Sequence, residues 1–426
     1  MTSAGCPYEP GSGARAALYG AGLDGGSLPE LYEKLRAEYG PVAPVTIAPG
    51  IPAWLVIGHR ELLELTHDEH HFSHDPRRWT PLREGRVPAD SPLMPMVGWR
   101  PALLYADGQQ HRRQRTAVAA ALGGVDGHGL RRIVQAAAER LIDGFIDSFT
   151  AQRQVDLVPH YARKLPLEVI IALLGLEERT AQLLTQAIAG TVAHNADSAN
   201  ASRRMAEILQ DLIAHKRAHP GDDFTSSLIH HEAQLTDDEI LHNLVVVFVA
   251  GNQTTVNWIS TTLRILLTDE AFRSSLTGGA MTVDDALDLV LWRYPPTQNF
   301  PARYATCDLE FGGRQVQTGD MLILGLAGAN ADPEALPPTG RPVTGNRSHL
   351  AFGAGPHACP AQDMARLITR TAVRTLHHRL PDLRLAEPES ELTWVTSPWS
   401  TGLAGLPVRT SSHPPSRTPS PQGDVR

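Results

Sequence analysis

Apolar residues recur at helical spacing over most of the chain. The stretch LPELYEKLRAEYGPV, which begins near Leu28, predicts a helix that ends at Gly40-Pro41. Residues 60–290 are mostly helical in pattern, apart from a polar, proline-bearing loop from about Asp75 to Arg100. We therefore expect helices to make up most of the fold.

Strand-like patterns are short and occur in two places. The stretch PVTIAPGIPAWLVIGHREL predicts two short strands around the turn APGIP. The stretch ATCDLEFGGRQVQTGDMLILGLA predicts further short strands, with turns at Gly312-Gly313 and at Thr318-Gly319-Asp320. The predicted fold class is therefore mainly α with small β-sheets.

No internal repeat and no break in composition divides the chain. We expect one domain over residues 1–412, followed by a disordered tail rich in proline and serine over residues 413–426.

Charge, cysteine content and hydropathy exclude several classes of protein. The 426 residues carry a formal net charge of −8, so no basic field favours nucleic acid or an anionic membrane. Three cysteines are too few for a disulfide framework. The N-terminus lacks the basic-then-apolar order of a signal peptide, and the most apolar run, LVVVFVAG, is too short to span a bilayer. We expect a cytoplasmic protein.

The segment HLAFGAGPHACPAQDMAR, residues 349–366, carries Cys359 between a glycine-rich turn and a predicted helix. Gly353 and Gly355 favour a tight turn, and Pro360 is acceptable in the first turn of a helix, which needs no N–H there. The sulfur is expected at a helix N-terminus, where the dipole and free amides favour a thiolate. Such a thiolate is a metal ligand or a nucleophile; the alternative is a buried, inert cysteine.

The full pattern Phe-Gly-x-Gly-x-His-x-Cys-x-Ala resembles the haem-binding loop of the cytochrome P-450 family, the haem-thiolate monooxygenases. Other segments fit the family in the right order over nearly the whole chain. The resemblance implies the haem-thiolate fold, haem b as cofactor, and Cys359 as the axial ligand of its iron. It further implies that His357 binds a haem propionate, that Phe352 shields the sulfur, and that Gly353 belongs to the same haem-binding loop.

Two more segments match propionate-binding positions of this family. The segment LLYADGQQHRRQRTAVAAAL predicts a helix capped by Asp107, with His111 and Arg115 on one face. By itself such a face is typical of a solvated helix surface; by resemblance, both residues bind propionates. Arg303, in NFPARYATCDLEFGG, resembles a third propionate-binding residue. Arginine and histidine bind carboxylates through charge-assisted hydrogen bonds.

The longest predicted helix begins at the capping box Thr236-Asp237-Asp238-Glu239 and runs to about Leu267. Its ~30 residues span ~45 Å. The stretch AGNQTT, residues 250–255, places a glycine and four polar residues in its apolar middle. This is either a packing notch or, by resemblance, the groove over the distal haem face, with Thr254 as the alcohol that helps deliver protons. The resemblance assigns the catalytic positions to Ala250, Gly251, Gln253 and Thr254.

The chain departs from the family pattern in two places. Gln253 stands where the family usually has an acid, and an amide has no carboxyl proton to donate. The family also has Glu-x-x-Arg before a PP turn, where this chain reads DLVLWRYPP. Alignment on Arg293 puts Val290 at the glutamate, and alignment on the proline puts Asp288 and Leu291 at the pair. Neither gives both charges, so we expect the buried ion pair to be missing and haem binding to be retained.

By resemblance, the distal pocket includes the loop Arg78–Trp99, and its substrate-contacting residues are Val246, Val249, Asn299, Phe300, Pro398 and Trp399. These segments offer aromatic and amide groups but few charges apart from the loop arginines. We therefore expect a small, neutral, ring-bearing substrate of natural-product type.

The resemblance implies an oxidoreductase of the soluble actinobacterial type, a monooxygenase or oxidase that uses O2 and electrons from NAD(P)H. A ferredoxin reductase and a ferredoxin are the expected redox partners, and exposed arginines, including Arg112 and Arg113, would suit an acidic donor. Hydroxylation and oxidative coupling both stay open as the reaction. The alternatives are a peroxide-driven oxidase and a haem-binding partner or sensor protein with weak turnover.

Overall fold

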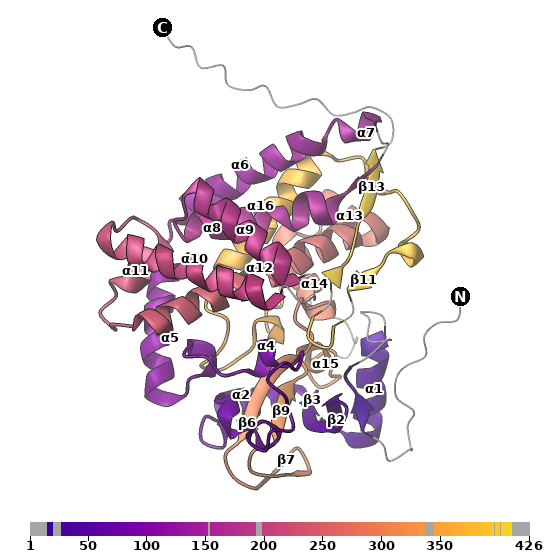
Figure 1. Ribbon diagram of the computed structural model, residues 1–426. Coiled ribbons are helices and arrows are strands. Elements are labelled where there is room, and N and C mark those ends of the chain that lie inside the picture. The colour runs from indigo at the N-terminus through magenta and orange to yellow at the C-terminus, as the bar shows by residue number, and fades with distance from the viewer. Residues whose placement is uncertain are drawn as a thin grey trace.

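The computed structural model describes residues 15–19, 27–151, 154–192, 198–336, 345–395, 397–400 and 402–410. Within these residues, helices fill most of the molecule, and the largest sheet lies at one end, at the bottom of the view in Figure 1. The predicted fold class, mainly α with small sheets, is confirmed. The predicted tail, residues 413–426, lies outside the described residues.

The largest sheet has six strands in the order β1-β2-β3-β9-β6-β4. The predicted pair around APGIP forms its antiparallel hairpin, β2 and β3, with Gly50 at φ 71° in the turn. Strand β9 joins β3 in parallel and β6 in antiparallel register, so segments far apart in the sequence meet here. The strands are β1 (Ala16–Ala17), β2 (Val42–Ala48), β3 (Ile51–Val56), β4 (Phe72–Ser73), β6 (Phe300–Ala305) and β9 (Met321–Leu324).

Three smaller sheets complete the β structure of the described residues. The turn predicted at Gly312-Gly313 joins β7 (Leu309–Phe311) to β8 (Arg314–Val316), and both glycines have positive φ. The other two sheets combine β10 (Leu383–Leu385) with β13 (Pro407–Thr410) and β5 (Val155–Asp156), and β11 (Trp394–Val395) with β12 (Gly402–Leu403).

Helix α12 (Asp237–Thr268) is the longest described helix and lies at the centre of the view in Figure 1. The predicted capping box is present, because the Thr236 hydroxyl accepts from the Glu239 amide at 3.2 Å and Glu239 Oε2 accepts from the Thr236 amide at 2.9 Å. The C-terminal half of α12 is buried in the largest apolar core, together with α6 and α16. The middle of α12 therefore lies between a capped N-terminus and a buried C-terminal half.

The remaining helices surround α12 or border the sheets. The predicted polar loop 75–100 is irregular but contains a 3₁₀ turn (Pro76–Arg78) and two single-turn helices. Other 3₁₀ turns span Leu103–Tyr105, Leu350–Phe352 and Glu389–Glu391, and a π-helical turn spans Val158–Ala162. The helices are α1 (Ser27–Tyr39), α2 (His59–His67), α3 (Thr80–Arg83), α4 (Met94–Val97), α5 (Gly108–Gly123), α6 (Gly127–Phe145), α7 (Ser148–Ala151), α8 (Lys164–Leu173), α9 (Glu178–Val192), α10 (Ser198–Ala218), α11 (Phe224–Ile229), α13 (Glu270–Thr277), α14 (Val283–Arg293), α15 (Leu326–Asn330) and α16 (Gln362–Arg379).

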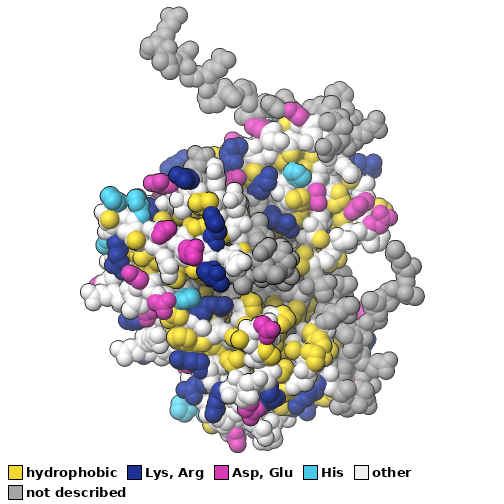
Figure 2. Space-filling view, viewed as in Figure 1, with side chains coloured by type: hydrophobic (Ala, Val, Ile, Leu, Met, Phe, Trp, Pro, Cys, Tyr) yellow, Lys and Arg dark blue, Asp and Glu magenta, His cyan; other side chains and the backbone are white. Residues whose placement is uncertain are grey.

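The surface carries charges of both signs. On the face seen in Figure 2, lysine and arginine side chains are interspersed with acidic ones, and apolar side chains gather in the lower half. Among the described helices, none combines the length and the apolar character that crossing a bilayer requires.

Candidate functional site

A cavity of about 290 Å³ lies between the middle of α12 and the loop before α16. It joins the two segments that the sequence singled out for chemistry, which are more than 100 residues apart in the chain. Of the predicted site residues, eleven line it: Val246, Ala250, Gly251, Thr254, Arg115, Phe300, Arg303, Phe352, Gly353, His357 and Cys359.

The cysteine loop requires glycine at two positions. Gly353 and Gly355 have φ values of 70° and 69°, which side chains rarely adopt. A Cβ at Gly355 would also lie 2.2 Å from the carbonyl oxygen of Thr66. The Cys359 amide donates to the Phe352 carbonyl at 2.8 Å and closes the loop. The helix begins later than expected, at Gln362, so Pro360 precedes α16 instead of occupying its first turn.

The environment of the Cys359 thiol has opposing effects. Burial raises its pKa, while a hydrogen bond from the Ala361 amide and the positive charge of Arg115 lower it. Arg115 Nη1 also donates to the Ala358 carbonyl at 2.5 Å and ties α5 to the loop. The ring of Phe352, the predicted shield, packs edge-on against Trp258 with 5.8 Å between centroids. The sulfur thus has an amide and a cation beside it.

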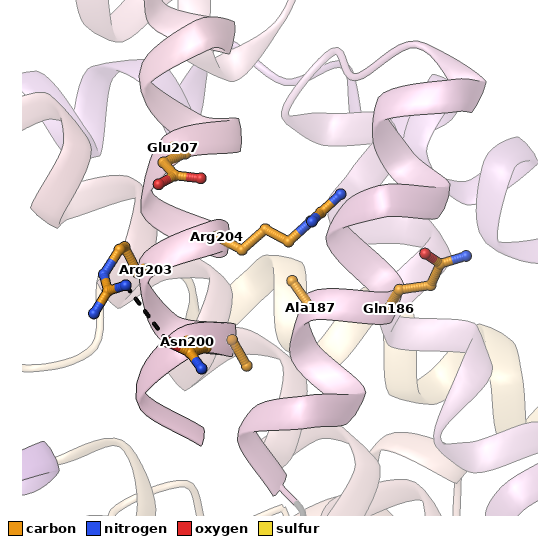
Figure 3. A pocket seen from close by; sticks show the side chains of 7 residues that line it. Gln186, Ala187, Asn200, Arg203, Arg204 and Glu207 are labelled. Atoms are coloured by element: carbon orange, nitrogen blue, oxygen red, sulfur yellow. Dashed lines mark hydrogen bonds between the residues drawn. The ribbon is translucent and has the colours of Figure 1, made fainter. Parts of the chain in front are cut away.

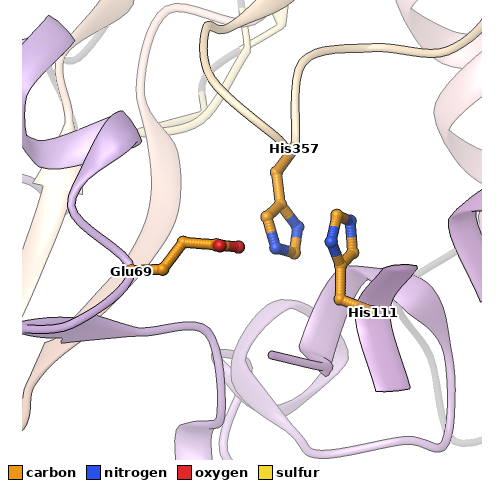
Figure 4. Close-up of side chains that lie close together, drawn as sticks. All are labelled: Glu69, His111 and His357. Atoms are coloured by element: carbon orange, nitrogen blue, oxygen red, sulfur yellow. The ribbon is translucent and has the colours of Figure 1, made fainter. Parts of the chain in front are cut away.

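The predicted propionate-binding residues form one basic cluster of histidines and arginines at the edge of the cavity. The rings of His111 and His357 lie face to face, 3.6 Å apart, with Glu69 beside them (Figure 4). Burial lowers the pKa of His111 to about 4 and that of Arg303 to about 9, and it holds the pKa of His357 far below its usual value.

Several buried polar atoms of this cluster have no partner among the described residues. They are Arg303 Nε, His357 Nε2 and both ring nitrogens of His111. Buried donors without partners destabilise a fold unless a ligand supplies the acceptors. An anionic group placed among these residues would provide acceptors and would favour their protonated forms.

The polar middle of α12 is largely hydrogen-bonded within the helix. Thr254 Oγ1 donates to the Ala250 carbonyl at 2.5 Å, and Thr255 Oγ1 to the Gly251 carbonyl at 2.6 Å. Gln253 Nε2 donates to Asn257 Oδ1 at 2.9 Å. Thr254 lines the cavity, whereas Gln253 is exposed and does not line it.

The expected substrate residues divide into two groups. Val246 and Phe300 line the cavity, whereas Val249, Asn299, Pro398 and Trp399 do not. Val249 is 52% exposed. The Asn299 side chain is fully buried and links two other segments of the chain. Its Oδ1 accepts from the Tyr32 hydroxyl at 3.0 Å, and its Nδ2 donates to the Pro398 carbonyl at 2.8 Å. The expectation that its amide is offered to a substrate is therefore wrong.

The expectation of a missing buried ion pair also needs correction. Asp288 of α14 has a side chain only 2% exposed and lies 2.6 Å from Arg366 Nη2 of α16 and 3.2 Å from Arg347 Nε. The pair exists, but its cations come from other elements instead of from α14 itself. Trp292 of α14 adds a further link by donating Nε1–H to the Asn346 carbonyl at 2.9 Å.

Two more expectations on charged residues are revised. Arg113 is engaged with Glu239 and with the carbonyls of Ala233 and Gln234, so of the pair Arg112 and Arg113 only Arg112 is exposed. Asp107 precedes α5, but its side chain makes no capping hydrogen bond there. Arg113 and Asp107 instead contact other elements of the fold, and the local sequence pattern does not predict these contacts.

Sequence reasoning missed one cavity residue that carries chemistry, His74. It lines the cavity, and its ring stacks on His357 with 3.3 Å between centroids. The available signal was a histidine directly after a short strand, in the stretch HFSHDP.

A second hollow opens at the surface between α9 and α10 (Figure 3). It is lined by Gln186, Ala187, Asn200, Ala201, Arg203, Arg204 and Glu207, and Arg203 Nη1 donates to Asn200 Oδ1 at 3.4 Å. None of the predicted site residues lies there.

The cavity thus places a cysteine in a closed loop and a threonine of α12 beside buried nitrogens that have no partner among the described residues, an arrangement that fits a haem-thiolate site. Known proteins agree. The chain is 32% identical to the cytochrome P450 monooxygenase PikC of Streptomyces venezuelae over 395 residues, 89% of this chain and 90% of the relative. It is 30% identical to 2-hydroxy-5-methyl-1-naphthoate 7-hydroxylase of Streptomyces carzinostaticus over 382 residues, 87% of this chain and 92% of that one.

A solved structure agrees over the same extent. Testosterone-bound CYP154C4 from a Streptomyces species superposes with a TM-score of 0.84 at 29% identity, covering 93% of this chain and 98% of the other. No protein-family model matches the chain. The chain belongs to the cytochrome P450 family and is an enzyme of the oxidoreductase class with haem as its cofactor.

Proposed function

We propose that the Cys359 thiolate would hold the iron of haem b, and that Arg115, Arg303, His111 and His357 would bind the two propionates. The buried nitrogens of the basic cluster, which have no partner among the described residues, support the second assignment, and the Ala361 amide and Arg115 beside the sulfur support the first. When bound, haem with a thiolate ligand supplies the chemistry of oxygen activation. The residues of the chain would bind and orient the haem and would exclude water from its surroundings.

On the distal side, Thr254 holds a hydroxyl in the cavity whose lone pairs can orient water, while its own proton is donated to Ala250. Ala250 and Gly251 leave room beside it because their side chains are small. Gln253 holds Asn257 and cannot cycle a proton at neutral pH. We infer that polar groups of the substrate complete the proton path.

The proposed substrate is a small, neutral, ring-bearing molecule of natural-product type, oxidised by hydroxylation or oxidative coupling. Ring-bearing compounds are named for two of the similar proteins, a naphthoate and testosterone, and of these only testosterone is also neutral. Of the described residues that line the cavity, only Arg115 and Arg303 carry a permanent charge, and the propionates would engage both, which leaves no permanent cation there for an anionic substrate. The observation that carries this proposal is the mostly apolar lining.

Electrons would come from NAD(P)H through a ferredoxin reductase and a ferredoxin. The exposed guanidinium of Arg112, on the helix that carries Arg115, supports docking of an acidic donor. A cytoplasmic location and a single catalytic domain over residues 1–412 belong to the same proposal, and the low cysteine count supports the location.

The decisive experiment compares two sources of oxidising equivalents. Purified protein is incubated with a compound that shifts the haem spin state, either with NADPH, ferredoxin reductase and ferredoxin, or with peroxide alone. Product only with the donor proteins is expected. Product with peroxide alone would instead favour a peroxide-driven oxidase, and product in neither case a haem-binding sensor.

A further inference from the structure

His74 is a buried histidine at the edge of the cavity, outside the positions that the family resemblance assigned. It follows β4, in which Phe72 pairs with Ala305 and Ser73 with Tyr304 of β6. One more step in this antiparallel register brings His74 beside Arg303. The His74 side chain is only 3% exposed and lines the cavity. A histidine buried this deeply normally has partners for its polar atoms.

One ring nitrogen of His74 has a partner that fixes the orientation of the ring. Nδ1 lies 3.1 Å from Asp107 Oδ1, which also accepts from the His74 amide at 2.9 Å. The Ser73 hydroxyl donates to the other carboxylate oxygen. Asp107 therefore uses its side chain to hold the Ser73–His74 segment and not to cap α5. Because a carboxylate only accepts, Nδ1 carries the proton.

The other ring nitrogen, Nε2, is buried and has no partner in the described part of the chain. The His74 ring stacks on His357, which in turn stacks on His111, so three imidazoles form one pile at the edge of the cavity. Next to this pile are the guanidinium groups of Arg303 and Arg115, which line the same cavity.

These neighbours favour an anion over a cation at Nε2. His74, Asp107 and His357 have the donor types of a metal site, and so do Glu69, His111 and His357. However, two nearby guanidinium groups repel a metal cation and attract a carboxylate. Burial and the charge of Arg303 lower the pKa of His74 when no anion is present, and a carboxylate would act in the opposite direction.

We propose that His74 is an additional haem-propionate ligand, with Nε2–H donating to a propionate oxygen and Nδ1–H to Asp107. The imidazolium ring is then held between two carboxylates, and Asp107 is a positioning residue. Hydrogen bonds between charged groups are about twice as strong as neutral ones. The inference rests on the proposed binding of haem b and extends its propionate site to a residue of the segment after β4.

The test measures how fast haem leaves the protein. His74→Phe keeps a flat ring in the stack and removes both N–H donors, so the holoprotein should release haem to apomyoglobin about tenfold faster than wild type. His70→Phe, four residues earlier at an exposed position, is the matched control and should leave the rate unchanged. Asp107→Asn should raise the rate by a smaller factor, and by none in the His74→Phe background.

Haem dimethyl ester distinguishes ligation from packing, because its esterified propionates carry no charge. Wild type and His74→Phe reconstituted with the ester should release it at equal rates. A tenfold difference that persists with the ester, or no difference with haem, would overturn the inference. If His74→Phe does not fold, an unchanged release rate in Asp107→Asn overturns it instead. Wild type that binds no haem would overturn the proposed function, a separate outcome.

Discussion

At the scale of single residues, Cys359 and Cys307 are both free thiols but have different surroundings. Cys359 lines the cavity opposite Thr254 and accepts from the Ala361 amide, whereas Cys307 follows β6 and is not among the lining residues. We expect Cys359→Ser to abolish the long-wavelength absorption band that thiolate ligation gives the ferrous–CO form. Cys307→Ser, the matched control, should keep it. A thiolate band that survives in Cys359→Ser would contradict the assignment of the ligand.

Gln253 allows a second test at this scale. Its amide is committed to Asn257, so we expect a carboxylate there to add little to proton delivery. Gln253→Glu and Gln253→Ala should each change the product formed per NAD(P)H consumed by less than about twofold with the true substrate. In wild type, this ratio should fall when the substrate's polar group is removed. A large rise in Gln253→Glu for substrate and deoxygenated analogue alike would show that the amide is a defect.

The sequence predicts which backbone conformation a residue needs better than it predicts which distant residues its side chain contacts. The need for glycine at 353 and 355 follows from the turn itself, and both have positive φ. The contacts of His74 depend on the register between β4 and β6, which is set by pairing across a large part of the chain. The contacts of Asn299 do not follow from the local sequence for the same reason, since its partners Tyr32 and Pro398 are distant in sequence.

At the scale of elements, α12 could be predicted because its capping box and apolar period are local signals. The ion pair of α14 could not be predicted from local signals. The family pattern places the partner of the acid on the same helix, whereas the partner of Asp288, Arg366, belongs to α16. Together with Arg347, this pair links α14 to the segments on either side of the cysteine.

We expect Asp288→Asn to lower the free energy of unfolding by ~3 kcal/mol, because breaking a buried pair leaves its cation uncompensated. Asp284→Asn, on the same helix, is the matched control; its pair with Arg370 is more exposed, and its loss should cost at most ~1 kcal/mol. Urea unfolding of the holoprotein measures both. Equal losses in the two variants would contradict a buried, supporting role for Asp288.

The pH dependence of this effect has a definite sign. Burial alone would raise the pKa of Asp288, but His349 and Arg366 outweigh it and hold the pKa below its usual value. The contribution to stability is therefore complete above the unfolded-state pKa of ~4 and is lost as the pH falls through the lower folded-state value. The difference between wild type and Asp288→Asn should shrink only below about pH 4.

At the scale of the whole molecule, the helical class follows from the apolar period of the sequence, and the hairpin around APGIP follows from its turn. The order of the six-stranded sheet could not be derived, because β9 is inserted between β3 and β6 by contacts that no local pattern specifies. The cavity results from this long-range assembly, which brings α12, β6 and the cysteine loop together. The family resemblance predicts that a cavity exists, but only the structure shows which residues line it.

The distribution of charge around this cavity gives the last prediction. Its cationic residues lie together at one edge, where the propionates would engage them, and its other lining residues are mostly apolar. A substrate carboxylate would therefore be buried without a partner, which is unfavourable. We expect the methyl ester of a ring-bearing acid to shift the haem spin state at concentrations about tenfold lower than the free acid, a difference of about 1.4 kcal/mol. Spectral titration of wild type with such matched pairs measures this ratio, with straight-chain fatty acids and their esters as the control for ring preference. Tighter binding of the free acids, or of fatty acids alone, would mean that a cation remains available to the substrate and that the proposed neutral class is wrong.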